Sequence, residues 1–151
     1  MSTITVPTGF AYLAPAFVST VFLLVGQAVT VGRHRKAAKI DYPRMYADNQ
    51  EMAASPAAMK FNCAQRAHQN TLENIPQIYG MTVILGLKYP IAAATALGMW
   101  VVSRIAYTVG YASGNPAKRN NFVFRIFYFP SSLTLLFGSI YSAYKLVAES
   151  M

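Results

Sequence analysis

The feature that most restricts the fold of this chain is an uncharged apolar run near its N-terminus. Residues 10–31 contain 22 consecutive residues without a charged side chain. A helix needs about 20 apolar residues to cross a hydrocarbon core about 30 Å thick. Positive charges follow the run, at Arg33, Arg35 and Lys36, whereas a secretory signal carries its positive charge before a shorter apolar stretch. We therefore expect an uncleaved first membrane helix whose N-terminus lies outside the cytosol.

Three more long apolar segments follow, and none shows the strict alternation of a membrane β-strand. We expect helices at about 10–32, 58–88, 91–113 and 121–147, with a polar connection at 33–57. The second helix begins with polar residues and carries Pro76, where we expect a kink. The chain is only 12% charged, about half of the usual share. These features predict a single domain over 1–151, an all-α membrane protein built as a bundle of four transmembrane helices.

The positive charges lie in the gaps between the apolar runs. The net charge is +8, and 11 of the 13 Lys and Arg residues fall in or next to the first and third connections, with Lys88 and Lys145 on the other side. Positive residues accumulate on the cytoplasmic side of membrane proteins, so this count predicts both termini outside and the basic connections in the cytosol. Membrane lipids are the expected partners of these charges. Nucleic-acid binding is not expected, because it needs a basic face with aromatic stacking platforms.

A polar stripe interrupts the apolar pattern at the start of the second helix. Arg66, Asn70 and Glu73 are spaced i, i+4 and i+7, which places them on one face of a helix over two turns. Charged groups at the mouth of a membrane helix are costly unless they face a partner or a polar cavity. One interpretation is that Arg66 with Glu73, and Arg104 of the third helix with its tyrosine neighbours, form pairs within the bundle that fix the register of the helices. The other is a binding site.

The third helix carries a similar stripe near the same end. Arg104, Tyr107 and Tyr111 are spaced i, i+3 and i+7, and Arg119 follows just beyond the helix. The arginines outnumber the one carboxylate, Glu73, and this excess favours a ligand with negative charges. Guanidinium groups bind carboxylates through paired hydrogen bonds, and the Glu73 carboxylate would bind an ammonium group of the ligand. A zwitterion with more than one carboxylate, such as glutathione, meets these requirements.

These stretches carry a resemblance to a known family. FNCAQRAHQNTLENIP (61–76) and RIAYTVGYASGNPAKR (104–119) resemble the signature stretches of the membrane-associated proteins in eicosanoid and glutathione metabolism (MAPEG). RAHQNTLE and the connection VGRHRKAAKIDYPRMYA (31–47) most resemble the microsomal glutathione transferase 3 branch. The resemblance covers about 31–125. It implies a homotrimer of four-helix bundles, with glutathione in a cleft between subunits that opens to the cytosol.

The resemblance also implies roles for individual residues. The family's positions that hold glutathione fall on Arg66, Asn70, Glu73, Tyr107 and Tyr111, while Arg35 reaches the tripeptide from a neighbouring subunit and Arg119 holds the sulfur as thiolate. We add Arg104 to the glutathione-binding set and expect Arg119 and Tyr107 to act in catalysis. Two positions depart from leukotriene-C synthase. Lys36 replaces an arginine with a second catalytic role there, and Asn74 replaces a tyrosine.

The expected function is that of an integral membrane glutathione transferase with glutathione-dependent peroxidase activity. Its substrates would be hydrophobic electrophiles or lipid hydroperoxides, with leukotriene-C synthase activity as a further option. Glutathione would be the co-substrate, and no metal is expected from one Cys and two His. The alternatives are a non-catalytic lipid-binding scaffold resembling 5-lipoxygenase-activating protein and a small transporter or channel subunit. The expected location is the endoplasmic reticulum (microsomal) or the outer mitochondrial membrane, with the active site facing the cytosol.

Overall fold

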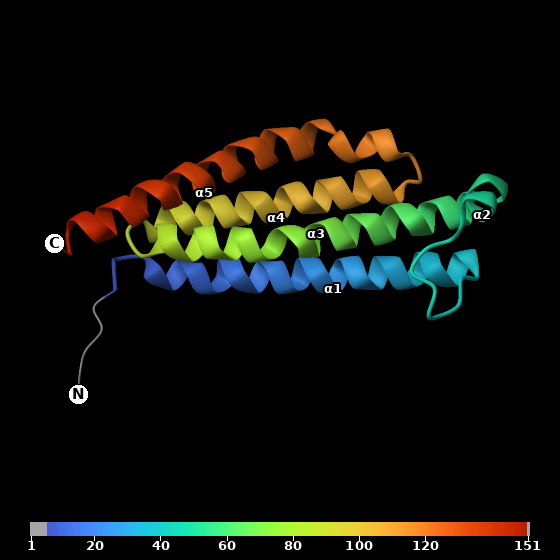
Figure 1. Ribbon diagram of the computed structural model, residues 1–151, viewed down its shortest axis with the longest axis horizontal. Helices are drawn as coiled ribbons and strands as arrows, with labels where there is room; N and C mark the ends of the chain where they lie inside the picture. The colour runs from blue at the N-terminus through green and yellow to red at the C-terminus, as the bar shows by residue number, and fades with distance from the viewer. Residues whose placement is uncertain (1–5, 151) are drawn as a thin grey trace.

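The computed structural model describes residues 6–150, and its regular structure is helical. Within this range no strand occurs, and four long helices lie side by side in one bundle (Figure 1). They are α1 (Leu13–Ala38), α3 (Pro56–Gly86), α4 (Pro90–Ala112) and α5 (Phe122–Ala148). The expected all-α architecture is confirmed. Residues 1–5 and 151 of the expected domain lie outside the described residues.

Shorter elements join these helices. A helix of six residues, α2 (Asn49–Ala54), lies between α1 and α3. Two 3-10 segments, η1 (Phe10–Tyr12) and η2 (Pro116–Asn120), precede α1 and α5. The helix α1 continues to Ala38, six residues past the expected end, so the basic cluster lies on its last turns. Cations are stabilised there by the helix dipole, and α2 occupies part of the expected connection. The helix α3 stays one helix through Pro76.

Local signals fix the start of each element at this end of the bundle. Asp48 accepts a hydrogen bond from the Glu51 amide while the Glu51 side chain accepts one from the Asp48 amide, which makes a capping box for α2. Ser55 caps α3, with Pro56 at the first helical position. Asn121 caps α5 by accepting from the amide of Phe124. These caps satisfy amide groups that have no partner within the helix and so define where each helix begins.

Three described segments are long and apolar enough to cross a membrane: Phe10–Ala38, Pro90–Ala112 and Phe122–Ala148. The helix α3 has 31 residues, but its first half is polar. Large apolar side chains on the outside of the bundle remain exposed, for example Phe22 at 73% and Phe137 at 63%. Such an apolar surface fits contact with lipid. These helices give the chain the character of an integral membrane protein.

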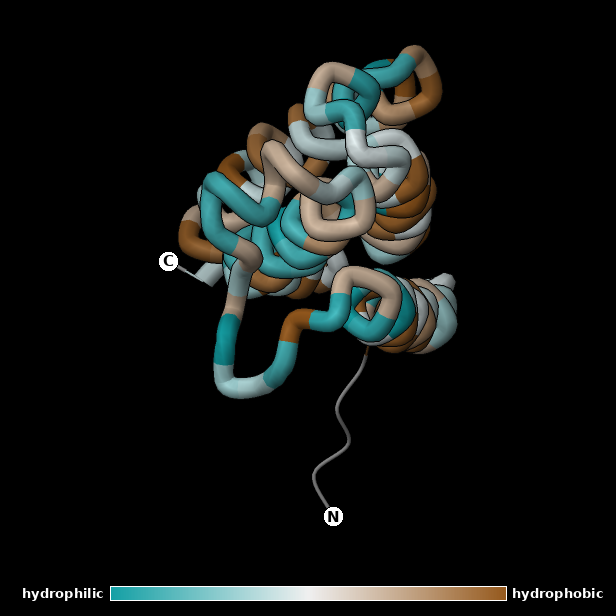
Figure 2. Tube along the Cα trace, turned by 90° about the vertical axis from the view of Figure 1, so that its right-hand side faces the viewer, coloured by the Kyte–Doolittle hydropathy of each residue, from teal (hydrophilic) through white to brown (hydrophobic). Residues whose placement is uncertain are grey.

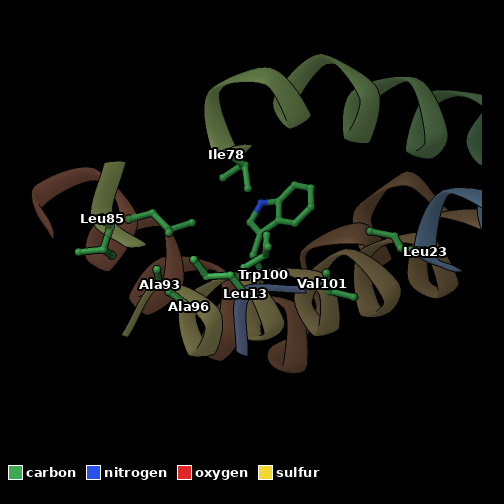
Figure 3. Packing of buried hydrophobic residues seen from close by; sticks show 10 residues of the cluster. Leu13, Leu23, Ile78, Leu85, Ala93, Ala96, Trp100 and Val101 are labelled. Carbon is green, nitrogen blue, oxygen red and sulfur yellow. The ribbon is translucent and has the colours of Figure 1, made fainter. Parts of the chain in front are cut away.

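The apolar core is centred on α4. Trp100 and Leu97 of α4 are fully buried, as is Leu135 of α5. Leu23 of α1 and Ile78 of α3 belong to the same cluster (Figure 3). The helix α4 therefore packs against all three other long helices.

Polar residues gather at one end of the bundle. The start of α1, the end of α5 and the turn between α3 and α4 lie together at the opposite end (Figure 1). Figure 2 looks onto the end that carries α2 and shows hydrophilic residues there. The first and third connections, which hold most of the basic residues, therefore share one end, as the charge count requires for a common side of the membrane.

Candidate functional site

A polar pocket of about 440 Å³ lies in the half of the bundle that carries α2 and η2. Its volume falls in the range of small-molecule sites. Its lining comes from α3, α4, η2 and the connection after α1, and consists of Tyr46, Arg66, Gln69, Asn70, Glu73, Tyr107, Tyr111 and Arg119. The structure thus brings the stripe of α3 and the tyrosines of α4 to one space, and Arg119 joins them.

The charged residues of the pocket make no ion pair with one another. The cations that form ion pairs among the described residues are Arg44, Lys88 and Lys145. Glu73 instead accepts a hydrogen bond from Gln69 Nε2 at 3.3 Å. An Arg66–Glu73 pair that fixes helix register is therefore absent from the described part of the chain. The guanidinium groups of Arg66 and Arg119 and the Glu73 carboxylate can therefore bind a ligand that carries both negative and positive charges.

Tyr46 also lines the pocket, although it belongs to neither helical stripe. Its hydroxyl donates a hydrogen bond to Gln69 Oε1, and Gln69 continues the chain to Glu73. The Arg66 guanidinium lies 5.8 Å from the centre of the Tyr46 ring. Burial raises the pKa of the Tyr46 hydroxyl; Arg66 partly opposes this rise, and Glu73 and Tyr111 add to it. The phenol therefore keeps its proton at neutral pH and orders Gln69 and Glu73.

Tyr107 and Tyr111 project from the buried face of α4. Their rings meet edge to face with centres 5.7 Å apart, and Tyr107 also packs against Phe124 of α5 at 5.2 Å. Arg119 reaches the same wall from η2. Its Nη1 donates to the Pro116 carbonyl at 2.9 Å, and its guanidinium lies 5.5 Å from the Tyr111 ring centre. A cation and two phenols are therefore presented together.

The position of η2 depends on a close contact with α4. A Cβ atom built on Gly110 would lie 2.1 Å from the carbonyl oxygen of Lys118. Asn121 Nδ2 donates to the Ala106 carbonyl at 2.8 Å and fastens the end of this segment. Only glycine allows the backbone of η2 to come this near, and Arg119 is carried to the pocket as a result.

Arg104 lies behind the pocket and is not part of its lining. The residue is 2% exposed. Its Nη2 donates to Asn70 Oδ1 at 2.9 Å and its Nε to Thr71 Oγ1 at 3.1 Å. The guanidinium also lies 4.1 Å from the ring centre of Tyr107. Arg104 therefore contacts two pocket residues, Asn70 and Tyr107, from the inside of the bundle.

The structure does not bring Arg35 to this pocket. Its guanidinium lies between the rings of Tyr42 and Phe61, at 4.3 and 4.6 Å. Its Nη1 donates to the carbonyls of Ile40, at 3.4 Å, and Arg44, at 2.6 Å. Arg35 is 7% exposed, so its cation is enclosed by its own chain. It ties the connection after α1 to α3.

An apolar groove of about 470 Å³ runs between α1 and α4. Phe22 and Val101 are among its walls, and its polar members are Ser19, Gln27, Thr30 and Thr108. The lining of this groove is uncharged, whereas the polar pocket is lined by Arg66, Glu73 and Arg119.

Among the described residues, no group of three His, Cys, Asp or Glu side chains could hold a metal ion.

One family of membrane proteins matches the chain over most of its length. The model of the MAPEG family covers residues 12–142. This stretch includes α1, α3, α4, most of α5 and every residue that lines the polar pocket. The family uses glutathione and includes glutathione transferases, peroxidases and leukotriene-C synthase, as well as non-catalytic members that resemble 5-lipoxygenase-activating protein. The chain therefore belongs to the MAPEG family.

Proposed function

We propose that this protein is a membrane glutathione transferase with glutathione-dependent peroxidase activity. The observation that carries the proposal is the polar pocket, in which Arg66, Arg119 and Glu73 form no ion pair among the described residues. Glutathione has two carboxylates, one ammonium group and one thiol, so Arg66 can meet a carboxylate, Glu73 the ammonium group and Arg119 the sulfur in its thiolate form. Membership of a family that uses glutathione supports the same ligand.

Each pocket residue has a role suited to its chemistry. Arg66 binds a glutathione carboxylate through paired hydrogen bonds, and Glu73 binds the ammonium group. The Asn70 amide and the Tyr111 hydroxyl hydrogen-bond the peptide groups of the ligand. Tyr46, through Gln69, keeps the Glu73 carboxylate oriented. Arg104 supports Asn70 from behind the pocket.

Activation of the thiol is the chemical task of the pocket. A free thiol has a pKa of about 8.5, and lowering it by about two pH units requires about 2.7 kcal/mol of preference for the thiolate. A charge-assisted hydrogen bond from the half-buried Arg119 is in this range, and the Tyr107 hydroxyl supplies a second donor. The thiolate then attacks an electrophilic carbon, forming a thioether as a leaving group departs or as an activated double bond is saturated and protonated. Alternatively, it attacks the terminal oxygen of a lipid hydroperoxide: the O–O bond breaks, glutathione becomes the sulfenic acid, and the lipid alkoxide takes up a proton and leaves as the alcohol. A second glutathione then converts the sulfenic acid to glutathione disulfide and water.

The proposal places this chemistry at the membrane surface. The helix α3 spans the bilayer together with the three more apolar helices, which makes four spans, and the pocket faces the cytosol. Apolar substrates arrive sideways from the bilayer, and the protein works as a homotrimer in the endoplasmic reticulum or the outer mitochondrial membrane. The 31-residue length of α3 supports the fourth span. The basic residues at the α2 end support the orientation.

Two substitutions test the proposal in turnover assays with a hydrophobic electrophile. Glu73→Gln should raise the glutathione KM because the ammonium group loses its partner. Arg119→Ala should leave binding in place and lower kcat at pH 7 by about 25-fold, since the thiolate fraction falls from about 75% to about 3%, the fraction of a free thiol. Arg125→Ala is the matched control, because this exposed arginine begins α5 and lies outside the pocket lining.

The outcomes separate the enzyme from a scaffold. Wild-type turnover in Arg119→Ala would refute the thiolate role. A purified wild-type protein that binds lipid but neither binds glutathione nor turns it over would instead be a non-catalytic lipid-binding protein of the same family.

A further inference from the structure

A buried hydrogen-bond network joins α1, α3 and α4 behind the polar pocket. Gln27 Nε2 of α1 donates to Thr71 Oγ1 at 2.8 Å and to Thr108 Oγ1 at 2.7 Å. Arg104 Nε donates to the same Thr71 oxygen at 3.1 Å, and Arg104 Nη2 reaches Asn70 Oδ1. Gln27, Thr71, Thr108 and Arg104 are all buried. The network thus begins on a helix that contributes no side chain to the pocket lining and ends at a residue that does.

The direction of these bonds follows from where each hydroxyl proton goes. The Thr71 hydroxyl donates to the Ala67 carbonyl at 3.0 Å, and the Thr108 hydroxyl donates to the Arg104 carbonyl at 2.7 Å. Each hydroxyl can therefore only accept from Gln27. Both lone pairs of Thr71 Oγ1 are then filled, one by Gln27 and one by Arg104. Thr71 Oγ1 therefore accepts hydrogen bonds from both the Gln27 amide of α1 and the Arg104 guanidinium of α4.

This arrangement fixes the orientation of a pocket residue. Because Arg104 Nη2 donates to Asn70 Oδ1, the Asn70 oxygen faces the bundle, and its Nδ2 group is the part of the amide left for the pocket. An NH₂ group is a donor, which suits a ligand carboxylate or carbonyl. If the guanidinium of Arg104 shifted, the Asn70 amide could turn and present an acceptor to the same ligand atom.

The network is also costly as a purely structural device. Polar side chains inside membrane helices lower stability unless all of their groups are satisfied. Gln27 Oε1 is buried and makes no hydrogen bond to the described residues. A contact that served only to hold α1 against α3 and α4 would be made at lower cost by apolar side chains. We therefore infer that this buried polar network has a role beyond packing the helices together.

We propose that Thr71 is a positioning residue for glutathione binding. It holds Arg104 in place, and Arg104 holds the Asn70 amide with its NH₂ group toward the ligand. This inference rests on the proposed function and extends it to residues that touch no ligand. It predicts that removing the Thr71 hydroxyl weakens glutathione binding while leaving the hydrophobic substrate unaffected.

The test compares two isosteric substitutions in the full-length, detergent-solubilised protein. Thr71→Val removes the acceptor of Arg104 and should raise the glutathione Kd about tenfold, with an equal rise in the glutathione KM. The kcat and the KM for the electrophile should stay at their wild-type values. Thr108→Val is the matched control, because it also deprives Gln27 of one acceptor but does not contact the Arg104 side chain, and its Kd should stay close to wild type. Thr71→Ser keeps the hydroxyl and should therefore bind glutathione with a Kd close to that of the wild type.

Each other outcome bears on one claim. Equal Kd values in Thr71→Val and Thr108→Val, or no recovery in Thr71→Ser, would overturn the positioning role while leaving the proposed function intact. A wild-type protein that binds no glutathione would contradict the proposed function itself. If Thr71→Val does not fold, Thr71→Ala removes the same hydroxyl without added bulk, and the same expectations apply to it.

Discussion

Tyr46 shows how a single hydroxyl outside the helices bears on the pocket. Tyr46→Phe removes the donor to Gln69 and keeps the ring against Arg66, so Glu73 loses an ordered neighbour. A neutral hydrogen bond contributes about 0.5–1.5 kcal/mol, so the glutathione Kd should rise about two- to tenfold. Isothermal titration calorimetry measures this change.

The control for this substitution lies four residues away. Tyr42→Phe makes the same change in the same connection, at a side chain that is 79% exposed and whose ring, not its hydroxyl, contacts Arg35. Its Kd should match that of the wild type. An unchanged Kd in Tyr46→Phe would show that the Tyr46–Gln69–Glu73 chain has no part in binding.

The sequence could predict some of these residues and not others. The spacing of Arg66, Asn70 and Glu73 is a property of one helix, so a periodicity argument finds their common face. Tyr46 lies in a connection where no periodicity applies, and only the folding of that connection over α3 brings it to the pocket. Arg35 was expected at the glutathione site but lies away from the pocket. The rings that enclose it come from Tyr42 and from Phe61 of α3, and this contact has no signature in the local sequence.

At the scale of elements, the contact between η2 and α4 should control activity. Gly110→Ala places a Cβ atom against the Lys118 carbonyl, so η2 must move and carry Arg119 away from the pocket. The substitution favours the helical state of α4 by about 1 kcal/mol, so a loss cannot come from the helix itself. We expect kcat to fall at least about tenfold, which corresponds to about 1.4 kcal/mol of thiolate stabilisation, with helix content by circular dichroism unchanged.

The same helix provides the control. Gly98→Ala adds a methyl group that would meet no atom within 4 Å apart from its chain neighbours and the backbone of its own helix, and its kcat should equal that of the wild type. Wild-type kcat in Gly110→Ala would mean that the close approach of η2 does not position Arg119.

The long helices were predictable because their signal is carried by span-length apolar runs. The differences are at their ends. The helix α1 extends through the basic cluster to Ala38, and its C-cap, Lys39, adopts a left-handed conformation (φ 55°). The short helix α2 depends on a capping box between Asp48 and Glu51, and η2 on its contact with α4. Short elements of this kind take their stability from caps and neighbours, which hydrophobic periodicity does not report.

At the scale of the whole molecule, the number of spans decides where the termini lie. Four spans put both ends on one side, whereas the three more apolar helices alone would put them on opposite sides. In a Cys63→Ala background, Thr8→Cys and Ser150→Cys should therefore react with a membrane-impermeant maleimide from the same face of sealed vesicles. Asn115→Cys, between α4 and η2, should react only from the other face. Labelling of Thr8→Cys and Ser150→Cys from opposite faces would exclude α3 as a span.

The bundle and its charge asymmetry were accessible from the sequence, since span length and the distribution of Lys and Arg are read without tertiary information. How deeply each polar side chain is buried in the bundle could not be predicted from the sequence. Arg104 shares a face with Tyr107 in sequence, yet it lies behind the pocket because Thr71 and Asn70 of α3 hold it there. Positions of this kind depend on how two helices face each other.

The central claim is that the pocket binds glutathione and holds its sulfur as a thiolate through Arg119. The most direct measurement is the ultraviolet absorbance of the thiolate as glutathione is titrated into the purified protein at neutral pH. We predict a saturable signal in the wild type and in Arg125→Ala, and its loss in Arg119→Ala at glutathione concentrations that still saturate binding. A wild-type protein that binds glutathione without any thiolate signal would contradict the claim.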